Sequence, residues 1–557
     1  MTPEPEARTP TPIDAVAERW VDTMVSLAPE WGVWLGRAGG EGEYSDYSPA
    51  GEERMAEAVS RALAELTATE AADAVDRVTK ADLSRELQLK LEKHEARLHL
   101  RDLNVIASPA QGIREIFDLM PSRTVAAYEH IAHRLSAVAA ALEGYEQTLR
   151  QGMEQGMTPA IRQVREVITE ARGHAASDGF LYSLVGAAEV GGVPVADSLR
   201  RDLDAGALSA ASAYAAFADF LENELAPAAT TTDAVGRDHY ALASRDFLGA
   251  SIDLDETYEW GLAELARMTS EQEDIARQIA GGSITEAIAH LDHDTSRKLY
   301  GTDALQAWMQ DLSDRAVAEL GRSQFDIPVE VRALECRIAP TQSGGIYYTG
   351  PSDDFSRPGR MWWSVPEGVT EFDTWRETTT VYHEGVPGHH LQIGIATYNK
   401  AQLNTWRRIA GSSGHAEGWA LYAERLMDEL GYLSDPGDRL GMLDGQRMRA
   451  ARVVLDIGVH LGKQRPDGRG VWDADYALEF MRANVNMDDA FTRFEVNRYL
   501  GWPGQAPAYK VGQRIWEQLR DEARTREGAD FSIRRFHRRA LDIGGVGLDT
   551  LRAALAE

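Results

Sequence analysis

Apolar residues recur at intervals of three and four through most of the first 321 positions of the chain, and helix breakers are scarce within each run. Residues 79–103 and 121–153 are two of the clearest examples, and Ser122 or Thr124 is a suitable N-cap for the second. This spacing gathers apolar side chains on one face of a helix, and such a face needs other helices to cover it. Residues 13–321 are therefore predicted to form a helical N-terminal region.

The spacing changes in the next stretch of the chain, which is richer in β-branched and aromatic residues. Three runs bounded by glycine and proline, residues 327–340, 344–351 and 359–368, predict three short strands and one small antiparallel sheet. Helical spacing resumes at residue 371 and continues nearly to the end. We expect a mainly α fold, in which residues 322–557 form the metal-binding catalytic region, with the small sheet next to the metal-binding helix. The two regions are expected to pack as one body.

The composition is that of a globular protein in a reducing compartment. Hydrophobic residues make up 43% and charged residues 26% of the chain, and no apolar run is long enough to predict a membrane-spanning helix. The only cysteine, Cys336, has no partner for an internal disulfide, and ordinary packing explains it. Residues 1–12 are acidic, rich in proline and threonine, and lack the apolar centre of a signal peptide, so they are predicted to be disordered. These features together favour a cytoplasmic location.

The charge of the chain limits its partners. It holds 58 basic and 88 acidic residues, which give a net charge of −30. A surface of this sign repels the phosphates of nucleic acids and the headgroups of anionic lipids. We therefore expect neither nucleic acid nor membrane among the partners, and a small molecule as the substrate. The charge says nothing about the oligomeric state.

Residues 378–394, TTTVYHEGVPGHHLQIG, combine histidines with a glutamate and with a proline flanked by glycines. An adjacent histidine and glutamate on a helix are typical of zinc hydrolases, in which the imidazole binds the ion and the carboxylate acts as general base. His383 and Glu384 form such a pair. The usual second ligand lies four residues after the first, but that position is Pro387 here.

The two later histidines are too far away to share an ion with His383 on a straight helix. His389 and His390 would lie about 9 Å and about 10.5 Å further along the axis, whereas zinc holds its nitrogen ligands at about 2.1 Å. Gly385 and Gly388 permit unusual backbone angles, and the proline between them removes a helical hydrogen bond. A kink with two residues looped out is therefore predicted, and it would bring a histidine back beneath His383.

A third ligand is expected from the next helix, which is predicted over residues 411–431 with Ser412 or Ser413 as its cap. Zinc hydrolases with a His-Glu helix often take a carboxylate from the helix that follows. Glu417 is 34 residues after His383 and lies beside glycine and tryptophan, in a stretch expected to be buried. A buried carboxylate needs a cation to stay ionised, so Glu417 is a candidate ligand.

Two more side chains on this predicted helix are candidates for the same site. Glu424 lies seven residues after Glu417 on the same face, where it binds the ion, orients an imidazole or pairs with a basic neighbour. His415 precedes Glu417 by two residues and is a further candidate ligand. A loop that merely contains histidines is the other interpretation of the first cluster, and the presence of a second cluster makes it the weaker one.

Several motifs occur in the order in which a known family has them. They read YHEGVPGHHLQ, GHAEGWALYAERLMDELGY, RMRAARVVLDIGVH, RYLGWPGQAPAYKVG and FHRRALDIGG, and GIYYTGPSDDFSRPGRMWW precedes them. From about residue 250 to residue 557 the chain resembles the bacterial family called domain of unknown function 885. Its members are usually described as zinc metallopeptidases, related in architecture to helical gluzincin-like carboxypeptidases and oligopeptidases.

The resemblance implies a set of ligands and a base. By position, it implies that His383 and His389 bind zinc, that Glu417 is the glutamate ligand and that Glu384 is the general base, with His390 as the competitor of His389. Gluzincins proper have H-E-x-x-H, and this chain departs from that pattern by two additional residues. Manganese and iron suit the same kinds of ligand as zinc.

Residues beyond these two helices are candidates for the remaining roles. Tyr509 is a candidate donor to an oxyanion, because helical gluzincins often use a tyrosine on a late helix; otherwise it is a buried tyrosine with a structural hydrogen bond. Arg498 either binds a substrate carboxylate in a bidentate way or forms a salt bridge with Glu495.

One histidine and two tyrosines complete the set of candidates. His460, one turn after Asp456, is either a relay or oxyanion donor or a hydrogen-bonded residue of the core. Tyr347 and Tyr348 lie on a predicted strand. That strand either binds an extended peptide by strand addition or packs its aromatic rings within the sheet.

The leading hypothesis is a zinc-dependent hydrolase of peptide or peptide-like amide bonds. Water activated by zinc attacks the carbonyl, and Glu384 takes its proton and delivers it to the leaving amine. A helical enclosure favours small peptides or amino-acid amides as substrates. The first alternative is a metal-dependent enzyme of specialised small-molecule biosynthesis that performs cyclisation, lyase or amide-transfer chemistry at the same site. The second is a non-catalytic helical binding protein, which would not need Glu384.

Overall fold

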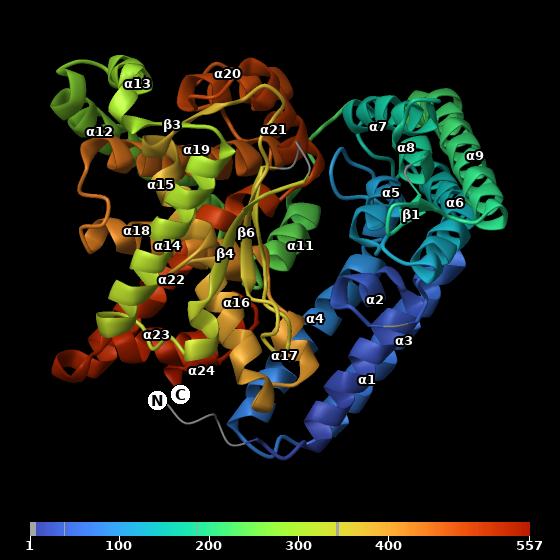
Figure 1. The fold of residues 1–557 in the computed structure, drawn as a ribbon, viewed down its shortest axis with the longest axis horizontal. Helices are drawn as coiled ribbons and strands as arrows, with labels where there is room; N and C mark the ends of the chain where they lie inside the picture. Colours follow the sequence, from blue (N-terminus) through green and yellow to red (C-terminus); the bar gives the residue numbers. More distant parts are fainter. Residues whose placement is uncertain (1–6, 38, 187, 341–344) are drawn as a thin grey trace.

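The computed structural model describes residues 7–37, 39–186, 188–340 and 345–557, and most of them are helical (Figure 1). Buried apolar side chains gather in three cores, two of them formed mainly by the first half of the chain. The mainly α class predicted from the sequence is confirmed. Within the described ranges, no helix has both the length and the apolar character needed to cross a membrane.

The smallest core lies between the first helices of the chain, drawn in blue in Figure 1. Trp20, Leu66 and Leu83 are buried in it, and Trp406 from much later in the chain packs against them. The elements of this part are α1 (Pro12–Leu27), α2 (Glu30–Leu35), α3 (Pro49–Ala68), α4 (Ala74–Glu95) and the 3₁₀ helix η1 (Leu98–Arg101). The contact with Trp406 fastens these helices to the C-terminal part of the molecule.

The second core belongs to the helices at the right of Figure 1. These elements are α5 (Pro109–Leu119), α6 (Val125–Glu154), α7 (Ile161–Ala175), α8 (Phe180–Gly186), the strands β1 (Glu189–Val190) and β2 (Val193–Pro194), α9 (Asp197–Phe220), the π-helical turn η2 (Leu221–Leu225) and α10 (Ala226–Ala228). Helix α6 packs along α9. Thr124 caps α6, as predicted, because its hydroxyl accepts the N–H of Ala127 at 3.1 Å.

The largest core runs from Tyr240 to Leu555 and contains the elements that position the candidate site. Before the sheet come α11 (Arg237–Leu248), α12 (Leu254–Ala280), α13 (Ile284–His293), η3 (Thr295–Arg297), α14 (Thr302–Ser323) and η4 (Val329–Arg332). After it come α15 (Thr374–Glu384), α16 (His389–Tyr398), η5 (Asn399–Ala401), α17 (Thr405–Ile409), α18 (Ser413–Glu429), α19 (Pro436–His460), α20 (Ala474–Asn484), α21 (Asp489–Gly501), α22 (Gln505–Glu527), η6 (Gly528–Asp530), α23 (Ile533–Asp542) and α24 (Leu548–Ala556). Helices on both sides of residue 321 therefore share this core.

The sheet that precedes α15 has three strands, but its pairing is mixed. The strands are β4 (Leu334–Ile338), β5 (Ile346–Thr349) and β6 (Gly359–Trp363), in the order β4-β6-β5. The predicted antiparallel pairing is found between β5 and β6, whereas β4 runs parallel to β6 with Cys336 opposite Met361. Residue 344, the first of the strand predicted over 344–351, lies outside the described residues. A separate antiparallel pair joins β3 (Lys298–Tyr300) to β7 (Glu371–Asp373).

Cys336 is an ordinary core residue, as predicted. Its side chain is buried on β4, and the Sγ atom lies 3.5 Å from Ser313 Oγ. Burial raises the pKa of the Cys336 thiol to about 11. The thiol is therefore protonated near neutral pH and poorly suited to act as a nucleophile.

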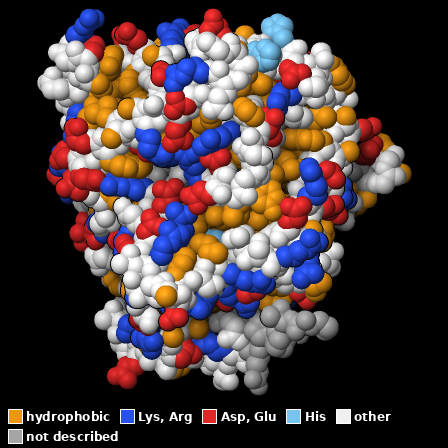
Figure 2. All heavy atoms as spheres, turned by 90° about the vertical axis from the view of Figure 1, so that its left-hand side faces the viewer, with side chains coloured by type: hydrophobic (Ala, Val, Ile, Leu, Met, Phe, Trp, Pro, Cys, Tyr) orange, Lys and Arg blue, Asp and Glu red, His pale blue; other side chains and the backbone are white. Residues whose placement is uncertain are grey.

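The side of the molecule at the left of Figure 1 carries basic and acidic side chains in close alternation (Figure 2). Ion pairs between α12 and the later helices contribute to such alternation. Arg425 of α18 lies 3.0 Å from Glu271, and Arg514 of α22 lies 2.6 Å from Glu256. These arginines are thus engaged by carboxylates of the protein itself.

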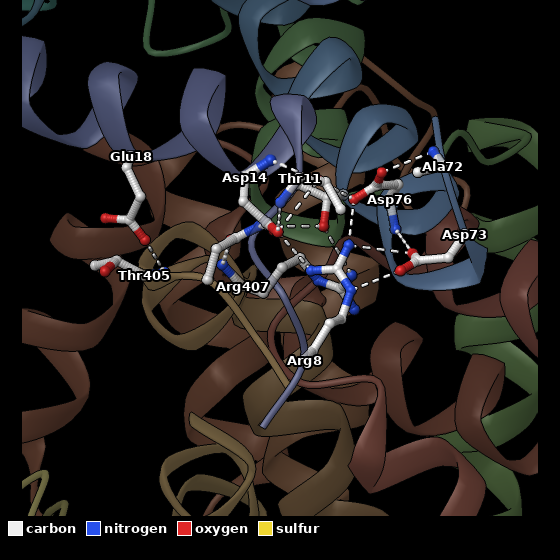
Figure 3. Close-up of polar contacts among 11 residues, drawn as sticks. Arg8, Thr11, Asp14, Glu18, Ala72, Asp73, Asp76, Thr405 and Arg407 are labelled. Carbon is white, nitrogen blue, oxygen red and sulfur yellow. Dashed lines mark hydrogen bonds and ion pairs between the residues drawn. The ribbon is translucent and has the colours of Figure 1, made fainter. Parts of the chain in front are cut away.

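The N-terminal segment predicted to be disordered, residues 1–12, contributes contacts to the fold. Its first six residues lie outside the described residues. Arg8 lies among three carboxylates (Figure 3), donating to Asp14 at 2.6 Å and to Asp73 at 2.7 Å and contacting Asp76 as well. Asp14 and Asp76 are buried, and buried carboxylates require such a cation. Charge pairing that composition does not reveal therefore orders the end of this segment.

Five helices of the largest core meet around the candidate site. Helix α18 packs along α22, and α15 packs against both α18 and α19. The α18–α22 contact is close because two glycines face each other: a Cβ on Gly418 would lie 2.4 Å from the backbone of Gly512. Helix α16 packs against α18 as well. The site is therefore built on helices whose positions are fixed by the core.

Candidate metal centre

The helix that carries His383 is broken where the sequence predicts a kink. Helix α15 ends at Glu384, and α16 begins at His389 after a turn that contains a cis Val386–Pro387 peptide. The N–H of Gly388 donates to the carbonyl of Tyr382 at 3.0 Å, six residues back instead of four. A Cβ on Gly388 would lie 1.8 Å from the carbonyl oxygen of His383, so only glycine fits there.

A tryptophan of the next helix holds this turn in place. The indole N–H of Trp419 lies 2.9 Å from the carbonyl oxygen of Pro387 and 3.2 Å from that of Gly388. Trp419 is fully buried on α18, and Ser412 caps that helix by accepting the His415 N–H. The turn and the N-terminal end of α18 are thus fixed relative to each other.

The kink brings two histidines and a glutamate together. His383 Nε2 lies 3.2 Å and His389 Nε2 lies 3.6 Å from the same oxygen, Glu417 Oε2. The two imidazoles are perpendicular, with centroids 4.8 Å apart, and the three donor atoms all lie within 4.8 Å of one another. Ligand atoms about 2.1 Å from a tetrahedral zinc ion lie about 3.4 Å apart. The metal trio, as we call His383, His389 and Glu417, therefore fits one divalent ion.

The electrostatics of the metal trio favour positive charge at the point where its donor atoms meet. Burial opposes ionisation of Glu417, but His389 and His383 hold the pKa of its carboxyl well below the usual range. Burial also opposes charge on His383, yet its hydrogen bonds to Glu417 and Glu424 raise its pKa to about 10. The surroundings of both groups thus stabilise a cation in contact with an ionised carboxylate.

Glu424 lies behind His383 and orients it. Its Oε1 atom is 2.8 Å from His383 Nδ1, and its Oε2 atom accepts a hydrogen bond from Gln446 at 3.0 Å. Gln446 in turn accepts a hydrogen bond from Lys510 at 2.6 Å. Because Nδ1 faces this carboxylate, Nε2 of His383 faces Glu417. Of the roles considered from the sequence, the structure places Glu424 in the orienting one.

Glu384 adjoins the metal trio and has no competing partner. It is buried at the end of α15, and within the described ranges its carboxylate accepts no hydrogen bond. Burial raises the pKa of Glu384, while His389 and His383 work against that rise. A carboxylate with a raised pKa next to potential ligands has the properties of a general base.

His390 points away from the metal trio. Its Nε2 atom lies 2.7 Å from the carbonyl oxygen of Val331, and its Nδ1 atom lies 2.9 Å from the hydroxyl of Tyr348. Burial lowers the pKa of His390 to about 4, so the ring is neutral and donates from Nε2. Both ring nitrogens of His390 are therefore engaged, and the Tyr348 hydroxyl is engaged by His390. Tyr347, on the other face of β5, stacks on Trp362 with centroids 6.3 Å apart.

His415 is also held apart from the metal trio. It is buried on α18, with Nδ1 at 3.4 Å from the side-chain nitrogen of Gln392, and its ring lies beside Trp516. Burial lowers the pKa of His415 to about 4. The carbonyl of His415 accepts the indole N–H of Trp516 at 3.1 Å. Its contacts are therefore those of a core residue at the α16–α18–α22 junction.

Arg498 and His460 belong to buried hydrogen-bonded networks. Arg498 donates to Glu495 at 3.1 and 2.9 Å and to Gln505 at 2.6 Å, so the salt bridge considered as an alternative is the arrangement observed. His460 Nε2 lies 3.0 Å from the carbonyl oxygen of Tyr499. Its ring stacks on Tyr240 with centroids 5.6 Å apart. The structure places neither residue in the metal trio.

Tyr509 is half-buried on α22, close to the metal trio. The guanidinium of Arg452 lies 5.4 Å and that of Arg449 lies 5.8 Å from the centroid of its ring. Burial and the nearby charge of Glu417 raise the pKa of Tyr509 to about 12. The phenol therefore remains protonated at neutral pH and is able to donate a hydrogen bond.

Arg449 is a residue of the site that the sequence analysis did not identify. Its positive charge lowers the pKa of both Glu384 and Glu424, and within the described ranges it forms no ion pair. The neighbouring Arg452 is engaged by Glu495 at 2.7 Å. The motif RMRAARVVLDIGVH contained the signal, since arginine is unusual on a helix that is otherwise buried.

The comparison with protein families identifies the chain. Residues 29–555 match the family described as "Bacterial protein of unknown function (DUF885)". The chain belongs to the DUF885 family. The match confirms the resemblance seen in the motifs and extends it from residue 250 back to residue 29. No curated protein matches this DUF885 protein.

Two solved structures share its fold over their full length. One is described as a "putative lipoprotein" from Colwellia psychrerythraea, with a TM-score of 0.84, 21% identity and 98% of each chain covered. The other is a "putative lipoprotein of unknown function" from Shewanella oneidensis, with a TM-score of 0.76, 15% identity and 99% of this chain and 100% of that chain covered. A carboxypeptidase from Pyrococcus furiosus aligns over 99% of this chain and 97% of its own, with a TM-score of 0.42 and 11% identity, and this likeness is too low to support an argument.

The cytoplasmic location predicted from the sequence is contradicted by these two structures. Both proteins are described as lipoproteins, and a protein anchored by lipid is not a free cytoplasmic one. The prediction relied on the composition, on the single cysteine and on the lack of a signal-peptide pattern in residues 1–12. The first two do not report on the compartment, because a core of this size does not need disulfides on either side of a membrane.

Proposed function

We propose that this DUF885 protein is a metal-dependent hydrolase of peptide or peptide-like amide bonds. The observation that supports it most is that the donor atoms of the metal trio lie within 4.8 Å of one another and that Glu384 directly follows His383 in the chain. A structural ion needs ligands but no base beside them. The position of Glu384 therefore favours a catalytic centre over a structural one.

The metal trio would hold the ion through two imidazole nitrogens and one carboxylate oxygen. A zinc ion bound there supplies Lewis acidity toward a carbonyl oxygen and makes water more acidic. Manganese and iron suit the same donors. Three protein ligands are the number found in catalytic zinc sites, which keep a position open. Glu424 keeps His383 in the tautomer and orientation that this coordination requires.

Glu384 moves the protons of the reaction. Its carboxylate takes a proton from the attacking water as oxygen bonds to the carbonyl carbon. It then delivers that proton to the nitrogen of the departing amine as the C–N bond breaks. Burial beside the metal trio raises its pKa, which strengthens it as a base and lets it carry the proton between the two steps.

Tyr509 and Arg449 stabilise the negative charge that develops. The Tyr509 hydroxyl is protonated and donates to the carbonyl oxygen as it becomes an oxyanion. Arg449 lies beside that ring without a carboxylate partner among the described residues, so its charge is free to act on the substrate. Arg449, in place of Arg498, therefore offers an unpaired guanidinium to the substrate.

The space beside the metal trio suits small substrates. A cavity of about 440 Å³ reaches the metal trio at Glu417, and it is lined by polar residues such as Arg408 and His415 as well as by small and apolar ones. Cavities of about 300–1,000 Å³ accommodate small molecules rather than folded chains. Short peptides or amino-acid amides are therefore the substrate class that we propose.

Replacing Glu384 with glutamine tests the proposal. The variant is expected to bind zinc as the parent does and to lose about 10²–10⁴-fold in the rate of hydrolysis, measured on a panel of dipeptides and amino-acid amides. Glu429→Gln, on the exposed end of α18, is the matched control and retains the parental rate. Equal rates for Glu384→Gln and the parent on a substrate that the parent cleaves would refute the role of Glu384.

A further inference from the structure

A second group of donor atoms lies far from the metal trio, in a cavity of about 620 Å³. The cavity is where the three cores meet, since Trp20 of the first, Leu103 of the second and Leu500 of the largest line it. The described residues that line it include no member of the metal trio and neither Glu384 nor Tyr509. The two sites are therefore distinct.

Three side chains of this cavity offer donor atoms within 4.8 Å of one another. Glu52 lies in the first turn of α3, His94 in the last turn of α4 and His99 in η1. The two imidazoles are nearly parallel, with centroids 5.0 Å apart. We call Glu52, His94 and His99 the cavity trio, and it matches the metal trio in the kinds of donor that it offers.

A tight reversal after α4 brings the two histidines together. Arg97 adopts a left-handed backbone conformation, with φ at 57°, which residues other than glycine seldom adopt. Its N–H donates to the carbonyl of His94 at 2.8 Å, and its guanidinium donates to Gln155 at 2.8 Å. The chain therefore turns back, and His99 lies over His94 instead of one turn further along a helix.

Two carboxylates of the cavity, those of Glu52 and Asp102, lack partners. Glu52 is half-buried and Asp102 is exposed, and both line the cavity. Neither carboxylate accepts a hydrogen bond from another described residue. Both lysines that line the cavity are paired, Lys93 with Asp246 at 2.6 Å and Lys90 with Glu86 at 3.3 Å. An unpaired carboxylate beside two imidazoles attracts positive charge, so the cavity favours the binding of a cation.

The imidazoles are suited to bind that cation. Among the described residues, no hydrogen bond or ion pair engages the ring of His99, so a ring nitrogen is free to bind an ion. His94 Nε2 lies 3.4 Å from Glu53 Oε1, which places a second carboxylate next to the cavity trio. Nitrogen donors combined with a carboxylate suit zinc and the neighbouring transition metals, whereas magnesium and calcium prefer oxygen donors alone.

We infer that Glu52, His94 and His99 form a second binding site, for a zinc-like divalent ion. The ion would join the start of α3 to the end of α4 and to η1, and so stabilise the meeting point of the three cores. This inference does not rest on the proposed hydrolysis, because the two sites share no residue.

Zinc stoichiometry tests the inference without any measurement of activity. Metal-free protein is dialysed against zinc chloride, and the bound zinc is counted by elemental analysis in the parent, His99→Gln, His389→Gln and the variant with both changes. We expect two, one, one and no ions in that order. Glu52→Gln, which keeps the size of the side chain, is a second variant of the cavity trio and is expected to bind one ion.

The controls separate loss of a site from loss of the fold. His290→Gln removes an exposed histidine of α13 and is expected to bind two ions. Zinc is expected to raise the melting temperature of His389→Gln but not that of the variant with both changes, and magnesium is expected to have no such effect.

The possible counts distinguish the two proposals. Retention of the parental count by both His99→Gln and Glu52→Gln overturns the second site, as does a parent that binds one ion and loses it only in His389→Gln. A parent that binds one ion and loses it only in His99→Gln supports the second site and contradicts the proposed metal centre.

Discussion

The metal trio and the cavity trio offer the same kinds of donor, but the protein supports them differently. Each combines two imidazoles and one carboxylate within 4.8 Å. In the metal trio, His383 is held by Glu424, and Gln446 holds Glu424 in turn. In the cavity trio, Glu53 lies 3.4 Å from His94, but no other described residue holds Glu53, and none holds Glu52. Ligands fixed from behind are typical of sites that must keep one geometry through a reaction.

The metal trio and the cavity trio have the same kinds of ligand but different surroundings. Glu384, Tyr509 and Arg449 lie around the metal trio and offer a base, a hydrogen-bond donor and a free positive charge. Around the cavity trio lie apolar walls, the ion pair of Lys93 with Asp246 and the unpaired Asp102. The type of ligand therefore indicates where an ion binds, whereas the neighbouring groups indicate whether the bound ion takes part in a reaction.

The largest effect is expected from Gly388→Ala, which would break the metal trio and leave the cavity trio intact. The new Cβ would lie 1.8 Å from the carbonyl oxygen of His383, so the turn must open. We expect a loss of about 4 kcal/mol or more in the free energy of unfolding, together with loss of one bound zinc ion. Chemical denaturation and elemental analysis measure the two quantities.

Gly112→Ala is the matched control for that substitution. Gly112 lies in α5, where a Cβ would meet no atom within 4 Å, so alanine is expected to leave stability unchanged or to raise it slightly. If Gly388→Ala behaves like Gly112→Ala, the turn is not held as the structure indicates.

A smaller effect is expected from Glu495→Gln, which weakens the buried network beside Tyr509. Burial opposes ionisation of Glu495, but Arg452 and Arg498 hold its pKa at about 2. A lowered pKa stabilises the folded protein above the usual value of about 4.3, and that stabilisation is lost as the pH falls toward 2. The variant should therefore be less stable than the parent by about 3 kcal/mol at pH 7.

The pH dependence distinguishes this explanation from a general loss of packing. The difference between parent and Glu495→Gln is expected to shrink as the pH falls below about 4, because the parent then loses the same charge. Urea unfolding at a series of pH values gives this difference. A gap that stays constant down to the acid limit would rule out the proposed charge effect.

Glu424→Gln is expected to have the smallest effect of the three substitutions. It tests most directly whether the two trios differ in how their ligands are held. An amide holds His383 less well than a carboxylate, so zinc affinity at the metal trio should fall about 10–100-fold. Glu53→Gln makes the corresponding change beside His94 of the cavity trio, where no orienting network exists, and should change affinity less. Competition with a chelating dye measures both affinities, and equal losses would remove the distinction between the two sites.

Local rules predicted the part of the candidate site that depends on neighbouring residues in the sequence. His383, Pro387 and Gly388 predict a kink because a straight helix separates the histidines, and the structure has that kink. Glu417 is predicted as a ligand because it lies on the next predicted helix, 34 residues after His383. The same rules do not decide between the two roles considered for Arg498, substrate binding and a salt bridge, because the decision depends on whether Glu495 packs against it.

Tertiary packing determined the features that the sequence did not reveal. The cavity trio lies on three elements, and no spacing marks its members as neighbours. Arg449 stands out only once Arg452 is seen to be paired with Glu495 and Arg447 to be hydrogen-bonded to Gln272 and Asn484. The parallel pairing of β4 with β6 is likewise a matter of strand order, which the pattern within each strand does not contain.

The central claim is that His383, His389 and Glu417 bind a single ion, and anomalous diffraction at the zinc edge tests it most directly. Crystals grown with zinc are expected to show a peak about 2.1 Å from His383 Nε2, His389 Nε2 and an oxygen of Glu417. A map with no peak between these atoms, or a zinc ion bound by His390 in place of His389, would contradict the account.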